Sequence, residues 1–313
     1  MSTVTAAVPG LRRRRRLTPA RRESLAFYAF LSPWLIGFVG LTLGPIIASL
    51  LFSFSDYDAI HPLSFIGLQN YQTIFQTPLF WQSLKVTAFY TLGAVPLGVI
   101  GALLLATLLN QKVPALSLWR TLYYLPVVTS GVAVALLWSW IFQPDFGVVN
   151  TILYNVFRIQ GPEWFFSPAW ALPAFVIMSI WGIGGPMLIY LAGMQGVPTQ
   201  LYEAAELDGA GRFQQYVRIT LPMISPVIFF NLIMLMIGSF QVFTGAFVIT
   251  QGGPSYATYF YVLYLYQEAF QYFHFGYASA LAWILFVIVM ALTALAFRFS
   301  SSLVYYDTKE EGR

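Results

Sequence analysis

The sequence predicts an all-α membrane protein with six transmembrane helices and with both termini in the cytoplasm. Three observations support this fold class: an apolar composition, six long apolar runs, and basic residues gathered on alternate loops. The 313 residues are 58% hydrophobic and 9% charged, whereas a soluble domain carries about 25% charged residues. The composition therefore excludes an ordinary globular enzyme and indicates a chain built for a bilayer.

Residues 1–24 form a polar and basic segment that contains Arg12–Arg16, Arg21 and Arg22. A secretory signal would continue with only about 7–15 apolar residues and a cleavage site, but here the apolar run extends from Phe27 to about Phe54. We therefore expect a first span that stays in the membrane. The arginines are best explained as a signal that holds the N-terminus in the cytoplasm. Contact with anionic lipid or with an acidic partner surface is the alternative.

Five further runs are each longer than the roughly 20 residues that a helix needs to cross a bilayer. They occupy residues 84–110, 120–142, 168–194, 223–250 and 276–299. The sequence thus predicts a six-span domain over residues 25–299, followed by a short cytoplasmic tail over residues 300–313.

The basic residues indicate which loops are cytoplasmic, because lysine and arginine are enriched on that side of membrane proteins. Only Lys85 and Arg158 fall on or near one side. The opposite side carries Arg12–Arg16, Arg21, Arg22, Lys112, Arg120, Arg212, Arg218, Arg298, Lys309 and Arg313. This distribution places the loop between spans four and five in the cytoplasm, and residues 55–83, 143–167 and 251–275 outside.

The loop between spans four and five reads as two short helices with a break. Thr199 is a plausible N-cap, and 3.6-residue spacing puts Leu201, Ala204, Ala205 and Asp208 on one face of the first helix. Gly209 and Gly211 can adopt the left-handed conformation that ends a helix. A second helix is expected over Arg212–Thr220, and Pro222 and Pro226 mark the turn into the fifth span. The result is a small apolar knob ringed by charges, which suits docking into a groove of another protein.

Three blocks of this loop closely resemble the EAA loop of binding-protein-dependent ABC transporter permeases, in the variant of the carbohydrate-uptake branch. They are Glu203-Ala204-Ala205, Asp208-Gly209-Ala210 and Leu221-Pro222. The resemblance implies that the loop is a cytoplasmic coupling helix seated in an ATPase subunit, with Arg212 also at that contact. An ordinary amphipathic loop between spans is the alternative.

Three outer segments are similar to the same family. They are residues 65–71 (Phe-Ile-Gly-Leu-Gln-Asn-Tyr), residues 138–150 with Pro144 and Gly147, and residues 266–270 leading to Gly276-Tyr277-Ala278. The resemblance implies an ATP-driven importer of a sugar or sugar-like solute. Its expected partners are a second permease subunit, two ATPase subunits, an extracytoplasmic solute-binding protein and membrane lipid. It also implies that this chain binds no cofactor and that ATP and Mg sit on the ATPase.

The segment from Tyr256 to Tyr277 is crowded with tyrosine and phenylalanine. We interpret most of these rings as an aromatic belt at headgroup depth. The alternative is a platform for an extracytoplasmic partner or for the face of a sugar.

Small and polar residues follow helical spacing inside three spans. In the second span Ala94, Gly98, Ala102 and Ala106 predict a face for close helix packing. In the fifth span a single helical stripe is expected over Asn231, Met234, Gly238, Gln241 and Gly245. In the fourth span the stretch from Gly182 to Pro186 cannot form a regular helix.

Amides, hydroxyls and aromatic rings at membrane depth suit a hydroxyl-rich solute, but they equally suit contacts between helices. The resemblance favours a cavity lined by these two spans. The candidate residues are Ser179, Trp181, Gly182, Asn231, Ser239, Phe240 and Gln241.

Several chemistries find no support in the sequence. There is no cysteine, no phosphate-binding glycine-lysine motif, no recognisable nucleic-acid-binding module and no metal-ligand cluster. No ionisable residue lies clearly within a span, which argues against the alternative of an ion-coupled carrier or channel. The lack of a catalytic constellation argues against a second alternative, a membrane-embedded enzyme.

Overall fold

The computed structural model describes residues 19–111 and 114–300. The sequence predictions for Arg12–Arg16, Lys112, Lys309 and Arg313 therefore lie outside the described residues. The chain divides into two compact units, residues 1–51 and residues 52–313.

The first unit is dominated by a helix that runs from Pro19 to Ser53 and so reaches the start of the second unit. It comprises α1 (Pro19–Gly37), a π-helical turn (Phe38–Leu43) and α2 (Gly44–Ser53). The helix confirms the predicted first span but begins before the apolar run. Proline at the first helical position needs no backbone hydrogen-bond partner, and Arg21, Arg22 and Glu23 favour helix well enough to extend it outward.

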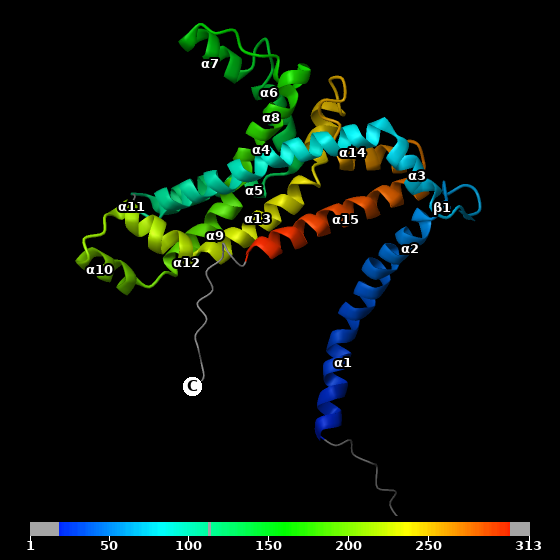
Figure 1. Cartoon of the computed structure of the whole chain (residues 1–313), viewed down its shortest axis with the longest axis horizontal. Helices are drawn as coiled ribbons and strands as arrows, with labels where there is room; N and C mark the ends of the chain where they lie inside the picture. Colours follow the sequence, from blue (N-terminus) through cyan, green and yellow to red (C-terminus); the bar gives the residue numbers. More distant parts are fainter. Residues whose placement is uncertain (1–18, 112–113, 301–313) are drawn as a thin grey trace, which may run out of the picture. The chain divides into compact units, whose positions relative to one another are not determined.

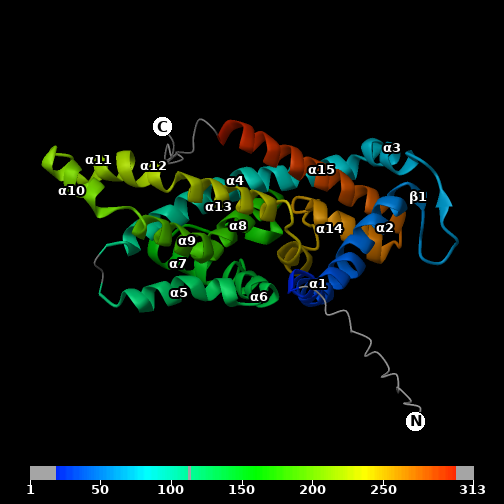
Figure 2. The same ribbon diagram turned by 90° about the horizontal axis from the view of Figure 1, so that it is seen from below.

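Three of the five remaining spans form long helices in the second unit. They are α4 (Pro78–Leu109), the segment Pro168–Gln195, and α15 (Phe275–Ser300). The middle one consists of α8 (Pro168–Ile180), a 3₁₀ turn (Trp181–Ile183) and α9 (Gly184–Gln195). The predicted irregularity is present at Gly182 as a tightened turn. The prediction is wrong for Gly184 to Pro186, which lie in the first turn of α9, where a proline breaks no helical hydrogen bond. Figures 1 and 2 show that α4 runs lengthwise beside α13 (Ser225–Ser239), and α13 in turn contacts α15.

The third span differs from the prediction of one helix over residues 120–142. It is a bent pair, α5 (Leu116–Val128) and α6 (Gly131–Ile141), whose axes meet at 101°. Thr129 and Ser130 between them are extended, with ψ of 141° and 134°. Pro126 weakens the end of α5 because it offers no backbone N–H. Thr129 and Ser130 are residue types that favour caps and turns over the helix interior, and α6 begins directly after them at Gly131.

The fifth span is also bent and shorter than predicted. The helical segment Arg212–Met223 meets α13 at 66°, and α13 ends at Ser239 rather than near residue 250. A π-helical segment over Ala246–Thr250 follows after a turn. The predicted continuous stripe is therefore wrong, because Gln241 and Gly245 lie beyond the end of the helix. Gly238 and Ser239 are weak helix formers, which explains the early end.

The small residues of the second span form the predicted packing face. Ala94, Gly98, Ala102 and Ala106 are all buried, and α4 packs against α8, α9 and α13. A Cβ atom added at Gly101 would lie 3.1 Å from a methyl group of Ile183. The close approach of these helices therefore depends on the small side chains of α4.

The outer segments contain their own short elements. A two-stranded antiparallel ribbon pairs β1 (Ser55–Asp56) with β2 (Ser64–Phe65), with Ser55 opposite Phe65. The other elements are α3 (Gln69–Gln76), α7 (Val148–Phe157), a 3₁₀ turn (Trp164–Phe166), α14 (Tyr261–Tyr266) and a π-helical turn (Gln267–Gln271). Figures 1 and 2 place the ribbon and α3 at one end of α4. The loop between spans four and five lies at the other end.

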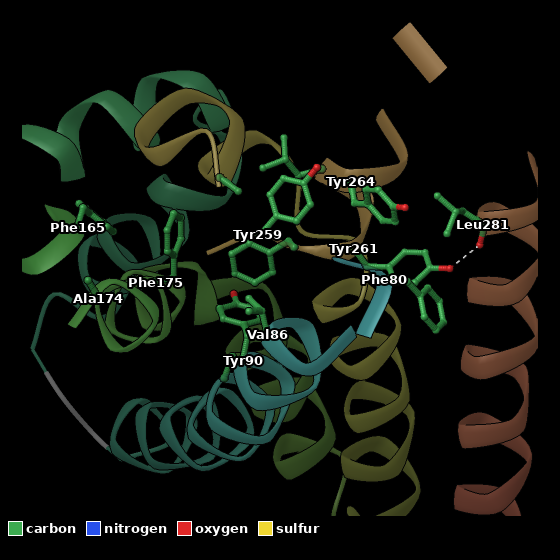
Figure 3. Close-up of a cluster of buried hydrophobic side chains, with 14 of the residues drawn as sticks. Phe80, Val86, Tyr90, Phe165, Ala174, Phe175, Tyr259, Tyr261, Tyr264 and Leu281 are labelled. Carbon is green, nitrogen blue, oxygen red and sulfur yellow. Dashed lines mark hydrogen bonds between the residues drawn. The ribbon is translucent and has the colours of Figure 1, made fainter. Parts of the chain in front are cut away.

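The aromatic segment after α13 is the largest departure from the sequence interpretation. Tyr259, Phe260, Tyr261 and Tyr264 are 0–4% exposed and belong to the main hydrophobic cluster with Phe80, Tyr90 and Phe175 (Figure 3). The backbone N–H of Tyr261 donates to Thr87 Oγ1 at 3.0 Å, and its hydroxyl donates to the carbonyl of Leu281 at 2.8 Å. The interpretation as an aromatic belt is wrong for these four rings, because all of them are buried inside the fold. Phe260, for example, packs against Tyr90 of α4 and Phe175 of α8.

Candidate functional site: an exposed helical loop and a membrane cavity

The loop between spans four and five folds as two helical parts separated by a glycine turn, as predicted. The first part is α10 (Thr199–Leu207), and the second comprises α11 (Arg212–Gln215), a π-helical turn (Tyr216–Thr220) and α12 (Leu221–Met223). Thr199 is the first residue of α10 rather than its N-cap, because Pro198 holds the extended cap position. The second part extends three residues past the predicted Thr220, and the bend lies at Ile224, between Pro222 and Pro226.

The two glycines after α10 differ in conformation. Gly209 has φ of +79°, whereas Gly211 is extended with φ of −72° and ψ of 163°. The N–H of Gly209 donates to the carbonyl of Glu206 at 3.0 Å, and that of Ala210 donates to Ala205 at 2.8 Å. These two bonds form a Schellman motif, which requires the left-handed conformation at Gly209 alone. The prediction of a left-handed residue is confirmed at Gly209 and wrong at Gly211.

Most of the predicted coupling residues are accessible. Glu203, Ala204, Asp208, Gly209 and Arg212 are exposed, whereas Ala205, Ala210, Leu221 and Pro222 are partly buried. The face predicted from spacing is thus turned partly inward at Ala205.

Two apolar side chains project from the loop and were missed by the sequence interpretation. Leu207 is 91% exposed and Phe213 is 79% exposed. The only signal in the sequence was that each is an isolated apolar residue between polar neighbours. Leu207 lies between Glu206 and Asp208, and Phe213 lies between Arg212 and Gln214. Large exposed apolar side chains beside charges are typical of a protein-binding surface.

Hydrogen bonds hold this exposed loop in one shape and attach it to α4. The hydroxyls of Tyr202 and Thr220 lie 2.8 Å apart and join the two helical parts. Thr107 Oγ1 of α4 donates to the Tyr216 hydroxyl at 3.1 Å, and Gln215 Nε2 donates to the carbonyl of Ala210 at 3.1 Å. A force applied to α10 or α11 would therefore reach the second span through specific contacts.

A cavity of about 200 Å³ lies among α4, α13 and the turn between α8 and α9. Its lining includes three predicted residues: Ser179, Gly182 and Ser239. Tyr90, Ala94 and Gly98 of α4 also line it, although the sequence interpretation gave α4 a packing role only. Ser239 Oγ donates to Thr91 Oγ1 at 2.9 Å, and Ser179 Oγ donates to the carbonyl of Val176 at 2.6 Å.

The other four candidate residues do not line this cavity. Asn231 is 3% exposed, and its amide donates to Val227 of its own helix at 3.0 Å. Phe240 is buried, and Gln241 is exposed in the turn after α13. Trp181 faces a larger, apolar cavity of about 680 Å³ beside the bend of the third span, where its ring contacts Trp138 edge-on with centroids 5.2 Å apart.

Comparisons with known proteins point to one transport family. The family described as "Binding-protein-dependent transport system inner membrane component" matches residues 94–304. The chain is 45% identical over 295 residues to the probable ABC transporter permease protein YesP of Bacillus subtilis (strain 168), which covers 93% of this chain and 95% of the relative. It is 37% identical to the sulfoquinovosyl glycerol transport system permease protein SmoG of Agrobacterium fabrum (strain C58 / ATCC 33970), over 76% of this chain and 77% of that protein.

The fold is similar to that of a solved transporter. The structure of a bacterial alginate ABC transporter, in complex with alginate pentasaccharide-bound periplasmic protein, superposes with a TM-score of 0.78 at 26% identity. The match covers 90% of this chain and 96% of the transporter chain.

Proposed function

The chain belongs to the family of binding-protein-dependent transport system inner membrane components, and we propose that it carries a sugar or oligosaccharide through the membrane. It is a multi-pass ABC transporter permease. The proposed solute class is supported by the sulfoquinovosyl glycerol and alginate specificities in the names of its relatives. It is also supported by hydroxyl groups of Tyr90, Ser179 and Ser239 at the cavity among α4, α8 and α13.

The observation that carries the proposal is the exposed loop α10–α12 at one end of α4. It offers Leu207 and Phe213 as apolar anchors, with Glu203, Asp208 and Arg212 exposed nearby. We propose that this loop seats in a groove of an ATPase subunit, which binds ATP and Mg. Closure of two such ATPases would push α10 and α11, and the hydrogen bond between Tyr216 and Thr107 of α4 would help to transmit the movement to the spans.

The remaining partners follow from the same family membership. A second permease subunit would complete the membrane pore, and an extracytoplasmic binding protein would deliver the solute. The charge distribution of the loops supports cytoplasmic termini and a cytoplasmic α10–α12 loop. The ribbon and α3 would then face the binding protein from the opposite end of α4.

Reconstitution tests the proposal directly. The chain, its partner permease and the ATPase subunits in liposomes should import a labelled oligosaccharide only when the binding protein and ATP are both present. Gly182→Leu should abolish uptake because the larger side chain would fill the cavity that Gly182 lines. No atom lies within 4 Å of an added Cβ at this position, so the substitution should not disturb the helices. Gln241→Leu, in the exposed turn, should leave uptake unchanged. Uptake without ATP, or unchanged uptake by Gly182→Leu, would contradict the proposal.

Orientation can be measured in intact cells because the chain has no cysteine. A single cysteine at Gln69, at the start of α3, should react with a membrane-impermeant maleimide. One at Gln214 in α11 should react only after the membrane is opened. Both positions are exposed, so accessibility within the fold does not favour either site, and the reverse labelling pattern would disprove the proposed orientation.

A further inference from the structure

Two family-like segments, at residues 65–71 and 266–278, are not accounted for by the cavity or by the α10–α12 loop. They meet at the end of α4 where α3 lies. Asn70 Nδ2 donates to the carbonyls of Ser53 and Ser55, both at 3.0 Å, and the N–H of Gly276 donates to the carbonyl of Tyr57 at 3.1 Å. A Cβ atom added at Gly276 would lie 2.1 Å from the carbonyl oxygen of Ser55. The backbone around Ser55 is therefore clamped between α3 and the start of α15.

Beside this backbone lies a cavity of about 370 Å³, lined mostly by residues that carry a polar group on the side chain. Its hydroxyl groups form a chain: those of Tyr264 and Tyr277 lie 2.8 Å apart, and Tyr277 donates to Thr77 Oγ1 at 3.4 Å. Burial, together with the bond to Tyr277, raises the pKa of the Tyr264 phenol. This hydroxyl is therefore neutral at physiological pH and can both donate and accept hydrogen bonds.

Two carboxylate side chains, Glu268 and Asp56, also line the cavity. Glu268 is 15% exposed at its side chain, and its Oε2 contacts His274 Nδ1 at 2.9 Å, where the imidazole is 61% exposed. Within residues 19–111 and 114–300, no side chain donates a hydrogen bond to Oε1 of Glu268. The exposed carboxylate of Asp56 also lines the cavity, whereas no lysine or arginine of the described residues does so. A mostly buried carboxylate with an unused oxygen favours a cationic partner that can donate hydrogen bonds.

We propose that this cavity receives a lysine or arginine side chain of the extracytoplasmic binding protein when that protein docks. The proposal rests on the proposed function, which places this end of α4 outside the cell. The cation would bind Glu268 and Asp56, and its remaining N–H groups would reach the hydroxyls of Tyr264 and Thr77. The outer segments carry five carboxylates against Lys85 and Arg158, a balance that steers a basic surface toward them. The carboxylates are Asp56, Asp58, Asp145, Glu163 and Glu268.

The test uses the whole transporter in nanodiscs with the binding protein that stimulates its ATP hydrolysis. Glu268→Gln preserves the shape of the side chain and should raise the half-saturating concentration of that binding protein about tenfold, the effect of one lost charge-assisted hydrogen bond. Asp56→Asn should raise it less, because its carboxylate is exposed. Basal ATP hydrolysis and the maximal stimulated rate should stay at wild-type values.

Two further variants separate docking from a structural role. Glu163→Gln, at an exposed carboxylate of another outer segment, should leave the half-saturating concentration unchanged. His274→Ala breaks the pair but keeps the Glu268 carboxylate, so it should not weaken docking. If His274→Ala and Glu268→Gln raise the half-saturating concentration equally, the His274–Glu268 pair has a structural role and the proposal is overturned. An unchanged half-saturating concentration for Glu268→Gln would also overturn it. Wild-type transporter that no binding protein stimulates would instead contradict the proposed function.

Discussion

Gly209→Val is expected to separate the ATPase subunit from the permease while leaving insertion of the chain unchanged. Gly209 has φ of +79° in the Schellman motif that ends α10, and a β-branched residue adopts this conformation only with strain of about 1–3 kcal/mol. No atom lies within 4 Å of an added Cβ, so backbone strain alone should cause the effect. The strain is relieved if Leu207 and α11 shift relative to each other, which would disturb the proposed docking surface.

Gly211→Val is the matched control for this experiment. The same substitution is made two residues away, where an added Cβ also has open space around it. Gly211 is extended, a conformation that valine adopts readily. Co-purification of the ATPase and solute-stimulated ATP hydrolysis should therefore be lost for Gly209→Val and retained for Gly211→Val. Equal behaviour of the two variants would mean that the glycine turn does not control coupling.

The sequence was sufficient to predict the four long apolar helices among the described residues, because about 20 apolar residues per helix is a requirement of the bilayer itself. The predicted count of six is reached only if each of the two bent helix pairs forms one span. Hydropathy does not report where such a helix bends. The break at Thr129 and Ser130 lies inside an apolar run. Because α13 ends at Ser239, only the first three residues of the predicted stripe share that helix, and Gln241 and Gly245 lie outside it. Gln241, which we predicted to line a cavity, is therefore exposed in a turn.

The aromatic segment shows a second limit of sequence reasoning. A run of tyrosines and phenylalanines is compatible with a membrane interface and with a packed core. The choice depends on partners far away in the sequence, such as Thr87 and Leu281 for Tyr261. In the same way, composition allowed either Gly209 or Gly211 to be left-handed, and only the hydrogen bonds of the folded loop distinguish them.

The candidate site was predictable where it follows local pattern and unpredictable where it depends on tertiary packing. Gly182 and Ser239 line the cavity as expected, but Tyr90 of α4 joins them because the small residues beside it let three helices meet. The exposed Leu207 was also missed, since its direction is set by the exact residue at which α10 ends.

Leu207→Asp should weaken ATPase binding more strongly than any substitution of the charged residues around it. The side chain is 91% exposed in this chain, and full burial of a leucine in a partner groove contributes about 1.5–3 kcal/mol. Truncation by Leu207→Ala should therefore lower the affinity of the ATPase subunit roughly 10- to 100-fold. The aspartate variant should go further because it would bury a charge without a partner. Phe213→Asp should act in the same direction.

Ile60→Asp provides the control, since Ile60 is 79% exposed near the ribbon, at the opposite end of α4 from α10 (Figures 1 and 2). The measurement is equilibrium binding of the isolated ATPase to the permease complex in nanodiscs, with thermal unfolding of the complex as a check on folding. Leu207→Asp should lose binding without a change in unfolding temperature, because an exposed side chain supports no packing within this chain. Wild-type affinity in Leu207→Asp and Phe213→Asp would mean that the ATPase binds elsewhere on the permease.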